Sequence, residues 1–166
     1  MPWAGIGLRS SWRKRWPVSV KWISVHGLNV AGGKIKGYFL RIARDEWVEK
    51  VFKSGRYYTL MRIAPVEGTY VFFLKKTEVG DSVIGYGVVE RTAAFHELTP
   101  AEREACMDHR WDRCIVFKRL TRLSRPVPLK ELPVEFGKAR GKYLHGRKVE
   151  DEELMRVLEA LEAEKP

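Results

Sequence analysis

The sequence predicts an α/β protein of the α+β kind, built on a small mixed, mostly antiparallel β pseudo-barrel with short flanking helices and a C-terminal helix. Three features lead to this fold class: about six strand-like segments, two short helical patterns between them, and one longer helical pattern at the end. Because most strands are not followed by a helix, a doubly wound parallel sheet is excluded. A small, partly closed barrel lets such strands bury one shared face.

The strand-like segments are short runs rich in apolar and β-branched residues. In the first of them, Val18, Val20 and Trp22 share one side of the chain. Gly85 and Gly87 interrupt a later one, which predicts a β-bulge or a close approach of two backbones. The predicted strands are residues 18–25, 35–42, 57–63, 69–74, 83–89 and 114–120.

Two short helices are predicted between strands. Residues 45–53 place Trp47 and Val51 on one helical face, and Gly55 suits the left-handed position just past the helix end. Thr99-Pro100-Ala101-Glu102 matches a capping box, with Thr as N-cap, Pro as the first helical residue and Glu as its partner. Arg125-Pro126-Val127-Pro128 is expected to be a stiff linker.

The chain divides into three predicted parts. Residues 1–17 form a basic, Trp-rich arm, in which Trp12 and Trp16 flank a basic triplet. Residues 18–148 form the barrel domain, including a basic, glycine-rich loop at 137–148. Residues 149–166 form an acidic C-terminal helix, whose apolar stripe consists of Leu154, Val157, Leu158 and Leu161.

Composition excludes several classes of protein. A chain of 166 residues that is 45% hydrophobic can bury a core, so wholesale disorder is excluded. No apolar run approaches the length of a spanning helix, so no membrane protein is expected, and the N-terminus lacks the ordered regions of a secretory signal. Cys106 and Cys114 cannot form a disulfide framework, so we expect a cytoplasmic protein. The absence of Gln and the single Asn, Asn29, are typical of a thermophile.

The charge is the first indication of function. The formal net charge is +10, and residues 1–36 hold seven basic and no acidic residues. The last eighteen residues hold seven acidic and two basic residues, so their net charge is negative. The excess of positive charge therefore belongs to the arm and the body of the protein. A polyanion such as RNA is the partner that this surface suits best. The alternative is that the basic charge serves solubility alone.

The order of motifs resembles that of the PUA-like superfamily, which includes PUA, ASCH, EVE and YTH domains. A strand at 39–42 is followed by a short helix, then by Lys53-Ser54-Gly55-Arg56 and a second strand at 57–62. A charged turn, another strand and a Gly-Asp strand at 79–89 come next. The resemblance covers roughly residues 34–125 and is strongest to an archaeal branch of the superfamily, with ASCH as the nearest named relative.

The resemblance implies a pseudo-barrel with an RNA-facing cleft. EVE and YTH relatives hold a modified base in an aromatic cage, and some ASCH relatives are enzymes that act on RNA or on acetylated cytidine. Gly55, Arg56 and Arg62 fit the ASCH pattern of a Gly-basic pair followed by a strand that ends in Arg. Tyr57 and Leu60 stand where the amidohydrolase branch has Lys and Thr, which counts against hydrolysis by those residues.

The candidate nucleic-acid contacts combine cations with rings that can stack on bases. For three of these candidates an alternative stays open. Arg62 could instead pair with a structural carboxylate such as Glu67 or Glu90, Trp111 could pack in the core, and loop 137–148 could be only a linker to the last helix. Since neighbours on a strand face opposite ways, at most one of Tyr57 and its neighbour Tyr58 is expected in the cleft. The candidates are Arg56, Tyr57, Arg62, Lys75, Lys76, Arg110, Trp111, Arg140, Lys142, Tyr143 and Arg147.

The prediction from sequence is therefore an RNA-binding domain that recognises structured RNA, such as tRNA or rRNA, or a modified nucleotide. Alternatives are an ASCH-type RNA-modifying or RNA-hydrolysing enzyme and a protein-interaction module that docks through its acidic helix. No metal or cofactor is expected, because His96, Cys106, His109 and Cys114 match no common zinc spacing. No nucleophile, base and oxyanion site is visible together, so catalytic residues stay unassigned.

Overall fold

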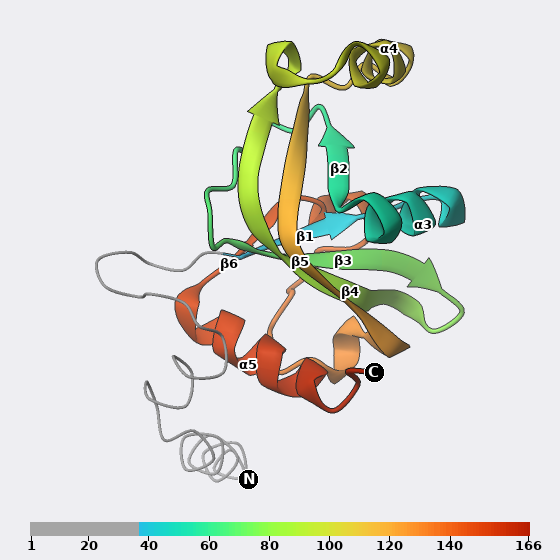
Figure 1. Ribbon diagram of the computed structural model, residues 1–166. Helices are drawn as coiled ribbons and strands as arrows, with labels where there is room; N and C mark the ends of the chain where they lie inside the picture. The colour runs from blue at the N-terminus through green and yellow to red at the C-terminus, as the bar shows by residue number, and fades with distance from the viewer. Residues whose placement is uncertain (1–36) are drawn as a thin grey trace, which may run out of the picture. The chain divides into compact units, whose positions relative to one another are not determined.

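The computed structural model of this protein describes residues 37–166; the predicted arm at 1–17 and the predicted strand at 18–25 lie outside these residues. Six strands and three α-helices make up the described domain (Figure 1). In chain order the elements are β1 (Gly37–Arg41), α3 (Asp45–Ser54), β2 (Arg56–Thr59), β3 (Tyr70–Thr77), β4 (Gly80–Ala94), η1 (Phe95–Glu97), α4 (Pro100–His109), β5 (Arg113–Pro128), η2 (Leu129–Glu131), η3 (Gly141–Leu144), β6 (Arg147–Val149) and α5 (Asp151–Glu162).

The strands form one mixed sheet in the order β2-β5-β4-β3-β1-β6. β1 runs parallel to β3, with Phe39 opposite Phe72, and every other pairing in this sheet is antiparallel. Because β2 and β6 are its edges, the sheet is a curled half-barrel and not a closed one. The predicted fold class, a mixed and mostly antiparallel pseudo-barrel with short helices, is confirmed.

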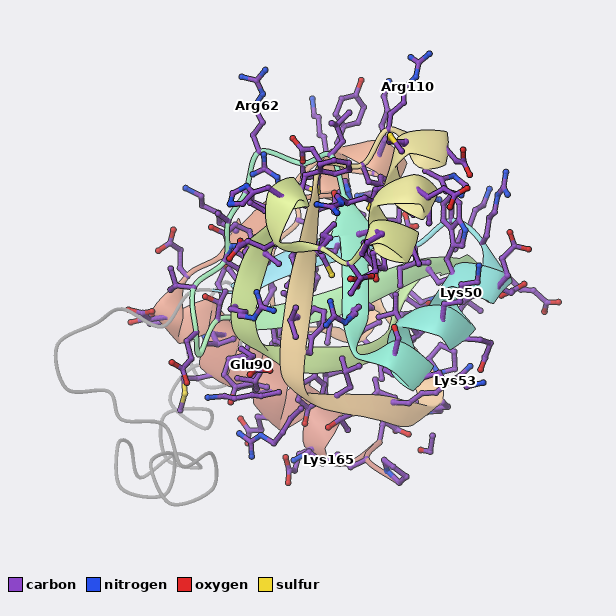
Figure 2. The ribbon with its side chains drawn as sticks, turned by 45° about the horizontal axis from the view of Figure 1, so that its top comes forward. Lys50, Lys53, Arg62, Glu90, Arg110 and Lys165 are labelled. Carbon is purple, nitrogen blue, oxygen red and sulfur yellow. The ribbon has the colours of Figure 1, made fainter. Side chains whose placement is uncertain are left out.

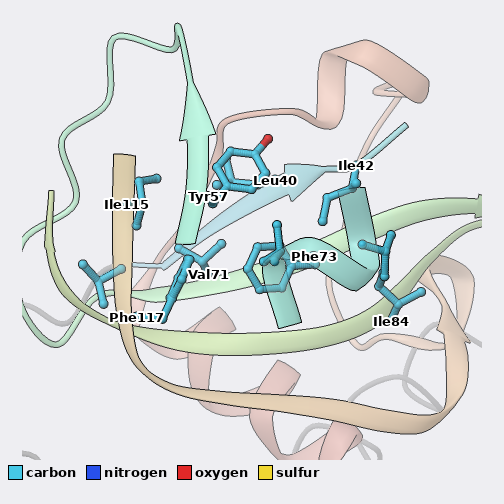
Figure 3. Packing of buried hydrophobic residues seen from close by; sticks show 11 residues of the cluster. Leu40, Ile42, Tyr57, Val71, Phe73, Ile84, Ile115 and Phe117 are labelled. Carbon is cyan, nitrogen blue, oxygen red and sulfur yellow. The ribbon is translucent and has the colours of Figure 1, made fainter. Parts of the chain in front are cut away.

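The sheet is covered on both faces, because β3 is apolar on both of its sides. Val71 and Phe73 belong to the cluster that packs with Val48 and Val51 of α3 (Figure 3). Tyr70 and Phe72 belong to the other side, where their rings stack 14° from parallel. The α5 helix lies on that second side (Figure 1), and its predicted apolar stripe is buried, as Leu154, Val157, Leu158 and Leu161.

The β4 and β5 strands are longer than predicted and form a bent ribbon. Their register shifts between Val83 and Gly85 and again near Val89, as β-bulges require. A Cβ atom at Gly85 would lie 2.6 Å from the carbonyl oxygen of Thr121 and would overlap the ring of Phe52. The predicted bulge and close backbone approach at the two glycines are therefore confirmed.

The predicted linker at Arg125-Pro126-Val127-Pro128 is instead the end of β5, so that prediction was wrong. Val127 pairs with Val83, and Pro128 pairs with Ser82. Since β2 pairs only with the first residues of β5, the far end of β5 has one free edge. Prolines are tolerated there because their missing N–H need not join the sheet.

The sequence motifs correctly predicted where α4 begins and where α3 ends. Thr99 accepts a hydrogen bond from the amide of Glu102 and donates its own amide to that carboxylate, which is the predicted capping box. Gly55 takes the left-handed conformation after α3, with φ of 69°. No helix in residues 37–166 combines the length and the apolar character that crossing a bilayer requires.

The glycine-rich segment at 137–148 is more ordered than a linker. It contains η3 and reaches β6, which pairs antiparallel with β1. β6 was not predicted, because three residues are too few to show a period of two. β6 pairs with residues 37–39 of β1, and His145, just before β6, accepts a hydrogen bond from the amide of Arg41 at the end of β1 that leads to α3.

Candidate functional site

A cavity of about 460 Å³ opens beside the free edge of β2. Its wall is made by α3, by β2 and the two residues after it, by the end of α4 with Trp111, and by Arg41, Ile42, Ala43 and His145. Both Tyr57 and Tyr58 line it, so the expectation that at most one would do so was wrong. Tyr57 packs with Phe73 and Tyr58 with Trp111, so the two side chains leave opposite faces of the strand and both still border the cavity.

Aromatic rings gather at this cavity around Trp111. The ring of His109 lies 4.3 Å from it and nearly parallel, and the ring of Tyr58 lies 5.9 Å away at 16°. Trp47 of α3 meets Trp111 edge to face at 5.7 Å. Rings from three separate elements therefore form one aromatic wall of the cavity.

The end of α4 explains how Trp111 reaches the cavity. Arg110 takes the left-handed conformation with φ of 59°, which ends the helix. The amide of Trp111 then bonds to the carbonyl of Cys106 at 2.9 Å, and the amide of Asp112 bonds to the carbonyl of Thr59 at 3.2 Å. These bonds turn the chain back towards β2 and hold the indole against it.

Glu102 joins α4 to β2 beside the cavity. Its Oε1 accepts from Nη1 of Arg56 at 2.8 Å and from the hydroxyl of Tyr58 at 2.6 Å. Burial opposes ionisation of Glu102, but the hydrogen bonds from Tyr58 and Thr99 and the charge of Arg56 outweigh it, so its pKa lies below the usual 4.5. Burial and this carboxylate together raise the pKa of Tyr58. The carboxylate is thus an ionised acceptor that orients Arg56 and Tyr58.

His145 enters the cavity from the glycine-rich segment. Its Nδ1 accepts a 2.9 Å hydrogen bond from the backbone amide of Arg41, and Gly146 donates its amide to the carbonyl of Phe39 at 2.7 Å. Gly146 has φ of 83°, and a Cβ atom there would overlap the side chain of Met61. Burial and the charge of Arg41 lower the pKa of His145 below 6.5, so its imidazole is neutral near neutral pH.

Three of the residues predicted to contact nucleic acid come together here. Arg56, Tyr57 and Trp111 all line the cavity. Arg62 and Arg110 each stand next to a lining residue, Met61 and Trp111. Both extend outward from the same end of the domain (Figure 2), and both are exposed. Glu67 pairs with Lys118, so it is not the partner of Arg62.

The other predicted contacts lie outside the cavity wall. Lys75 pairs with Asp45 at 3.0 Å, and Lys76 is exposed next to it on β3. Arg147 pairs with Glu153 at 3.2 Å and lies over the ring of Phe136. From the glycine-rich segment, Arg140, Lys142 and Tyr143 are exposed outside the wall.

Sequence reasoning missed several residues of the wall. Trp47 carried the signal of a core helix face, and it does contact the core, but it also borders the cavity. Lys50 is exposed and lines the cavity one helical turn from it. His109 and His145 belonged to no recognised motif, and only the fold brings their rings here. Among residues 37–166, no three His, Cys, Asp or Glu side chains lie close enough to hold a metal ion.

Comparison with known proteins identifies solved structures that share this fold. No protein-family model and no curated protein matches the sequence. Two solved chains match the structure. The crystal structure of ASCH from Zymomonas mobilis has a TM-score of 0.51 and 13% identity over 73% of this chain and 94% of that one. A single-residue variant of the same protein has a TM-score of 0.48 and 15% identity over 73% and 96%. The described domain therefore has the PUA-like fold of ASCH domains, as the order of its motifs predicted.

Proposed function

We propose that this protein binds RNA by seating an unstacked base in the cavity beside β2, while cations around the opening contact the phosphates. The observation that carries this proposal is the meeting of Trp47, Tyr58 and Trp111 at one cavity. Stacking of a base on an aromatic side chain is worth about 1–3 kcal/mol and tolerates any base. The cavity volume lies within the range of roughly 300–1,000 Å³ that small-molecule sites occupy.

Cations without ion-pair partners support contact with phosphate. Lys50, Arg62 and Arg110 are exposed, and none of them forms an ion pair with another residue in the described part of the chain, although the charge of Arg62 helps to lower the pKa of Asp112. Of the net charge of +10, residues 1–36 supply +7, so residues 37–166 carry only +3. Affinity for RNA within the described domain would therefore depend on where its unpaired cations lie rather than on its total charge.

The RNA we propose is structured, such as tRNA or rRNA, or carries a modified nucleotide. Proteins read RNA sequence mainly at loops and bulges, where a base can leave the stack and enter a pocket. The likeness of the fold to ASCH domains supports an RNA partner, because the PUA-like superfamily is known for RNA-facing clefts.

Two observations favour binding over the alternatives. Glu102 is already held by Arg56 and Tyr58, so this carboxylate is a positioning group and not a free general base. The apolar stripe of α5 is buried inside the domain, so only its acidic face is left for a protein partner. A cytoplasmic setting remains our proposal, supported by two buried cysteines that are both free thiols.

The test measures binding of the full chain to fluorescein-labelled tRNA by anisotropy at several salt concentrations. We expect affinity to fall steeply with salt, and Lys50→Ala to lower the slope of log K against log salt by about one. Lys130→Ala, which removes an exposed lysine outside the cavity wall, is the matched control and should leave the slope unchanged.

A lack of RNA binding at low salt would refute the proposal, as would equal slopes for the wild type and Lys50→Ala. Incubation of the protein with total RNA, followed by analysis of nucleoside composition, separates binding from modification. A protein that only binds leaves the composition unchanged.

A further inference from the structure

The charged side chains that line the cavity are all positive. Its charged residues are Arg41, Lys50 and Arg56, and none of the described residues that line it is an aspartate or a glutamate. The nearby Glu102 has its Oε1 occupied by Arg56 and Tyr58, and its Oε2 accepts from the amide of Thr99. The carboxylate therefore faces protein donors, and the charged side chains that line the cavity are all cations, of which Arg41 is paired with Asp81.

His145 adds a donor whose tautomer is set by the backbone. Because Nδ1 accepts the amide of Arg41 at 2.9 Å, the proton of the neutral imidazole must sit on Nε2. The backbone is anchored before and after His145, since Gly141 donates its amide to Asp81 and Gly146 donates its amide to the carbonyl of Phe39. Within residues 37–166 no protein acceptor is bonded to Nε2, which leaves this N–H for a ligand.

Four side chains of the wall carry hydroxyl groups, and those of Ser54 and Thr59 can both donate, whereas the hydroxyl of Tyr58 already donates to Glu102. Oγ of Ser54 accepts from the amide of Arg56 at 3.2 Å, and Oγ1 of Thr59 accepts from the amide of Met61 at 3.0 Å. A hydroxyl that accepts from an amide keeps its own hydrogen to donate. Arg56 also keeps N–H groups beyond those that bind Glu102 and Cys114, because a guanidinium has five.

Building on the proposed function, we propose that the cavity selects a keto base, uracil or guanine, over an amino base, cytosine or adenine, with Nε2–H of His145 donating to the exocyclic carbonyl. A keto base presents a carbonyl oxygen, which is an acceptor, where an amino base presents an NH₂ donor. With the exocyclic group of the base at His145, the amino group of cytosine or adenine would face Nε2–H and lose its bond to water. Leaving a buried donor unpaired costs more than a neutral hydrogen bond gains, so the discrimination comes chiefly from the disfavoured base.

The test is calorimetric titration of the full chain with the four nucleoside 5′-monophosphates, with uridine and cytidine, and with inorganic phosphate. We expect the uridine and guanosine monophosphates to bind about tenfold more tightly than the cytidine and adenosine monophosphates. Uridine should exceed cytidine by a similar factor, because the preference lies in the base. Equal binding of the four nucleotides would overturn the inference, as would inorganic phosphate binding as tightly as the uridine nucleotide.

Two substitutions at His145 test its role separately from folding. His145→Leu removes both ring nitrogens, whereas His145→Gln keeps an N–H donor near the position of Nε2, and both lose the acceptor for the Arg41 amide. We expect the preference for uridine over cytidine to disappear in His145→Leu and to persist in His145→Gln. A preference that survives in a folded His145→Leu would overturn the role of this residue, and the wild-type panel stands even if that variant does not fold.

Failure of this inference is distinguishable from failure of the proposed function. If tRNA binding depends on Lys50 but uracil and cytosine bind equally, the preference for a keto base is wrong and RNA binding stands. If tRNA binding does not depend on Lys50 and no nucleotide binds, both proposals are wrong.

Discussion

Tyr58 donates a 2.6 Å hydrogen bond to Glu102 across 44 residues of sequence, and this bond ties the edge strand β2 to α4. The same carboxylate oxygen also binds Arg56, so a single side chain of α4 orients two residues of the cavity. The strand that carries them has one free edge, because it pairs only with β5. The position of the cavity therefore depends on an interaction between side chains as well as on the sheet.

Glu102→Gln should lower the free energy of unfolding by about 1 kcal/mol. The substitution leaves the partly buried Arg56 without its counter-charge, and the partial exposure of both side chains keeps the cost moderate. Urea denaturation followed by circular dichroism measures the change. The control is Glu104→Gln on the same helix, whose side chain is exposed and which should alter stability by less than about 0.5 kcal/mol. Equal stabilities of the two variants would contradict the role of Glu102.

The effect of Glu102→Gln should depend on pH. The pKa of Glu102 in the folded protein lies below the usual 4.5, so its contribution to stability is present above that value and is lost as the pH falls through the folded-state pKa. The stability difference between wild type and variant should therefore be full near neutral pH and should shrink as the pH falls below 4.5 and through the lower pKa of the folded state. Urea midpoints measured across this range provide the test. A difference that stays constant on acidification would show that the carboxylate is not held ionised by its partners.

Gly85→Ala should be far more costly than Gly37→Ala, although both glycines lie in buried strands. At Gly85 the new methyl group would meet the carbonyl of Thr121 at 2.6 Å, and a backbone cannot move aside cheaply. At Gly37 the nearest atom is Cβ of Val149 at 3.2 Å, so a small adjustment of side chains suffices. Overpacking of this kind costs about 1–3 kcal/mol, and we expect the full amount only at Gly85. Thermal denaturation compares the two variants, and similar melting temperatures would refute the close approach of β4 and β5.

Both cysteines should be unreactive in the folded protein. Burial raises the pKa of Cys114 to about 11, although Arg56 opposes the shift, and burial also raises the pKa of Cys106. The thiolate is the reactive form, so a thiol reagent such as Ellman's reagent should label neither side chain at about pH 8 until denaturant is added. Rapid labelling of one thiol in the native protein would show that the core under α4 opens locally. Cys106→Ala and Cys114→Ala then identify which residue reacts.

Local patterns predicted the elements whose stabilising groups are close in sequence. The Thr99 capping box, the C-terminal glycine of α3 and the apolar stripe of α5 each lie within a few turns of chain, so the residues that define them are visible together. The glycines of β4 were also informative, because only a missing side chain permits the approach of Phe52 and Thr121 to Gly85. The order of these elements was enough to indicate the PUA-like fold.

The cavity was only partly predictable, because its residues come from distant parts of the chain. Arg56 and Trp111 were identified by residue type, yet the basic loop at 137–148 contributes His145 rather than its arginines, its lysines or its tyrosine. His145 was overlooked because its role comes from one backbone bond to Arg41, 104 residues away. Trp47 was predicted only as part of an apolar helix face, because a face that borders a cavity has the same period as one that is buried.

The sequence by itself determined the helices, most of the strands, the mixed architecture and the excess of positive charge. These properties depend on propensity, periodicity and composition, which act over short stretches of chain. Tertiary structure alone decided which side chains share the cavity, which cations are already paired with carboxylates, and which nitrogen of His145 carries the proton. Those outcomes depend on contacts between residues far apart in sequence, and such contacts leave no periodic signal in the sequence.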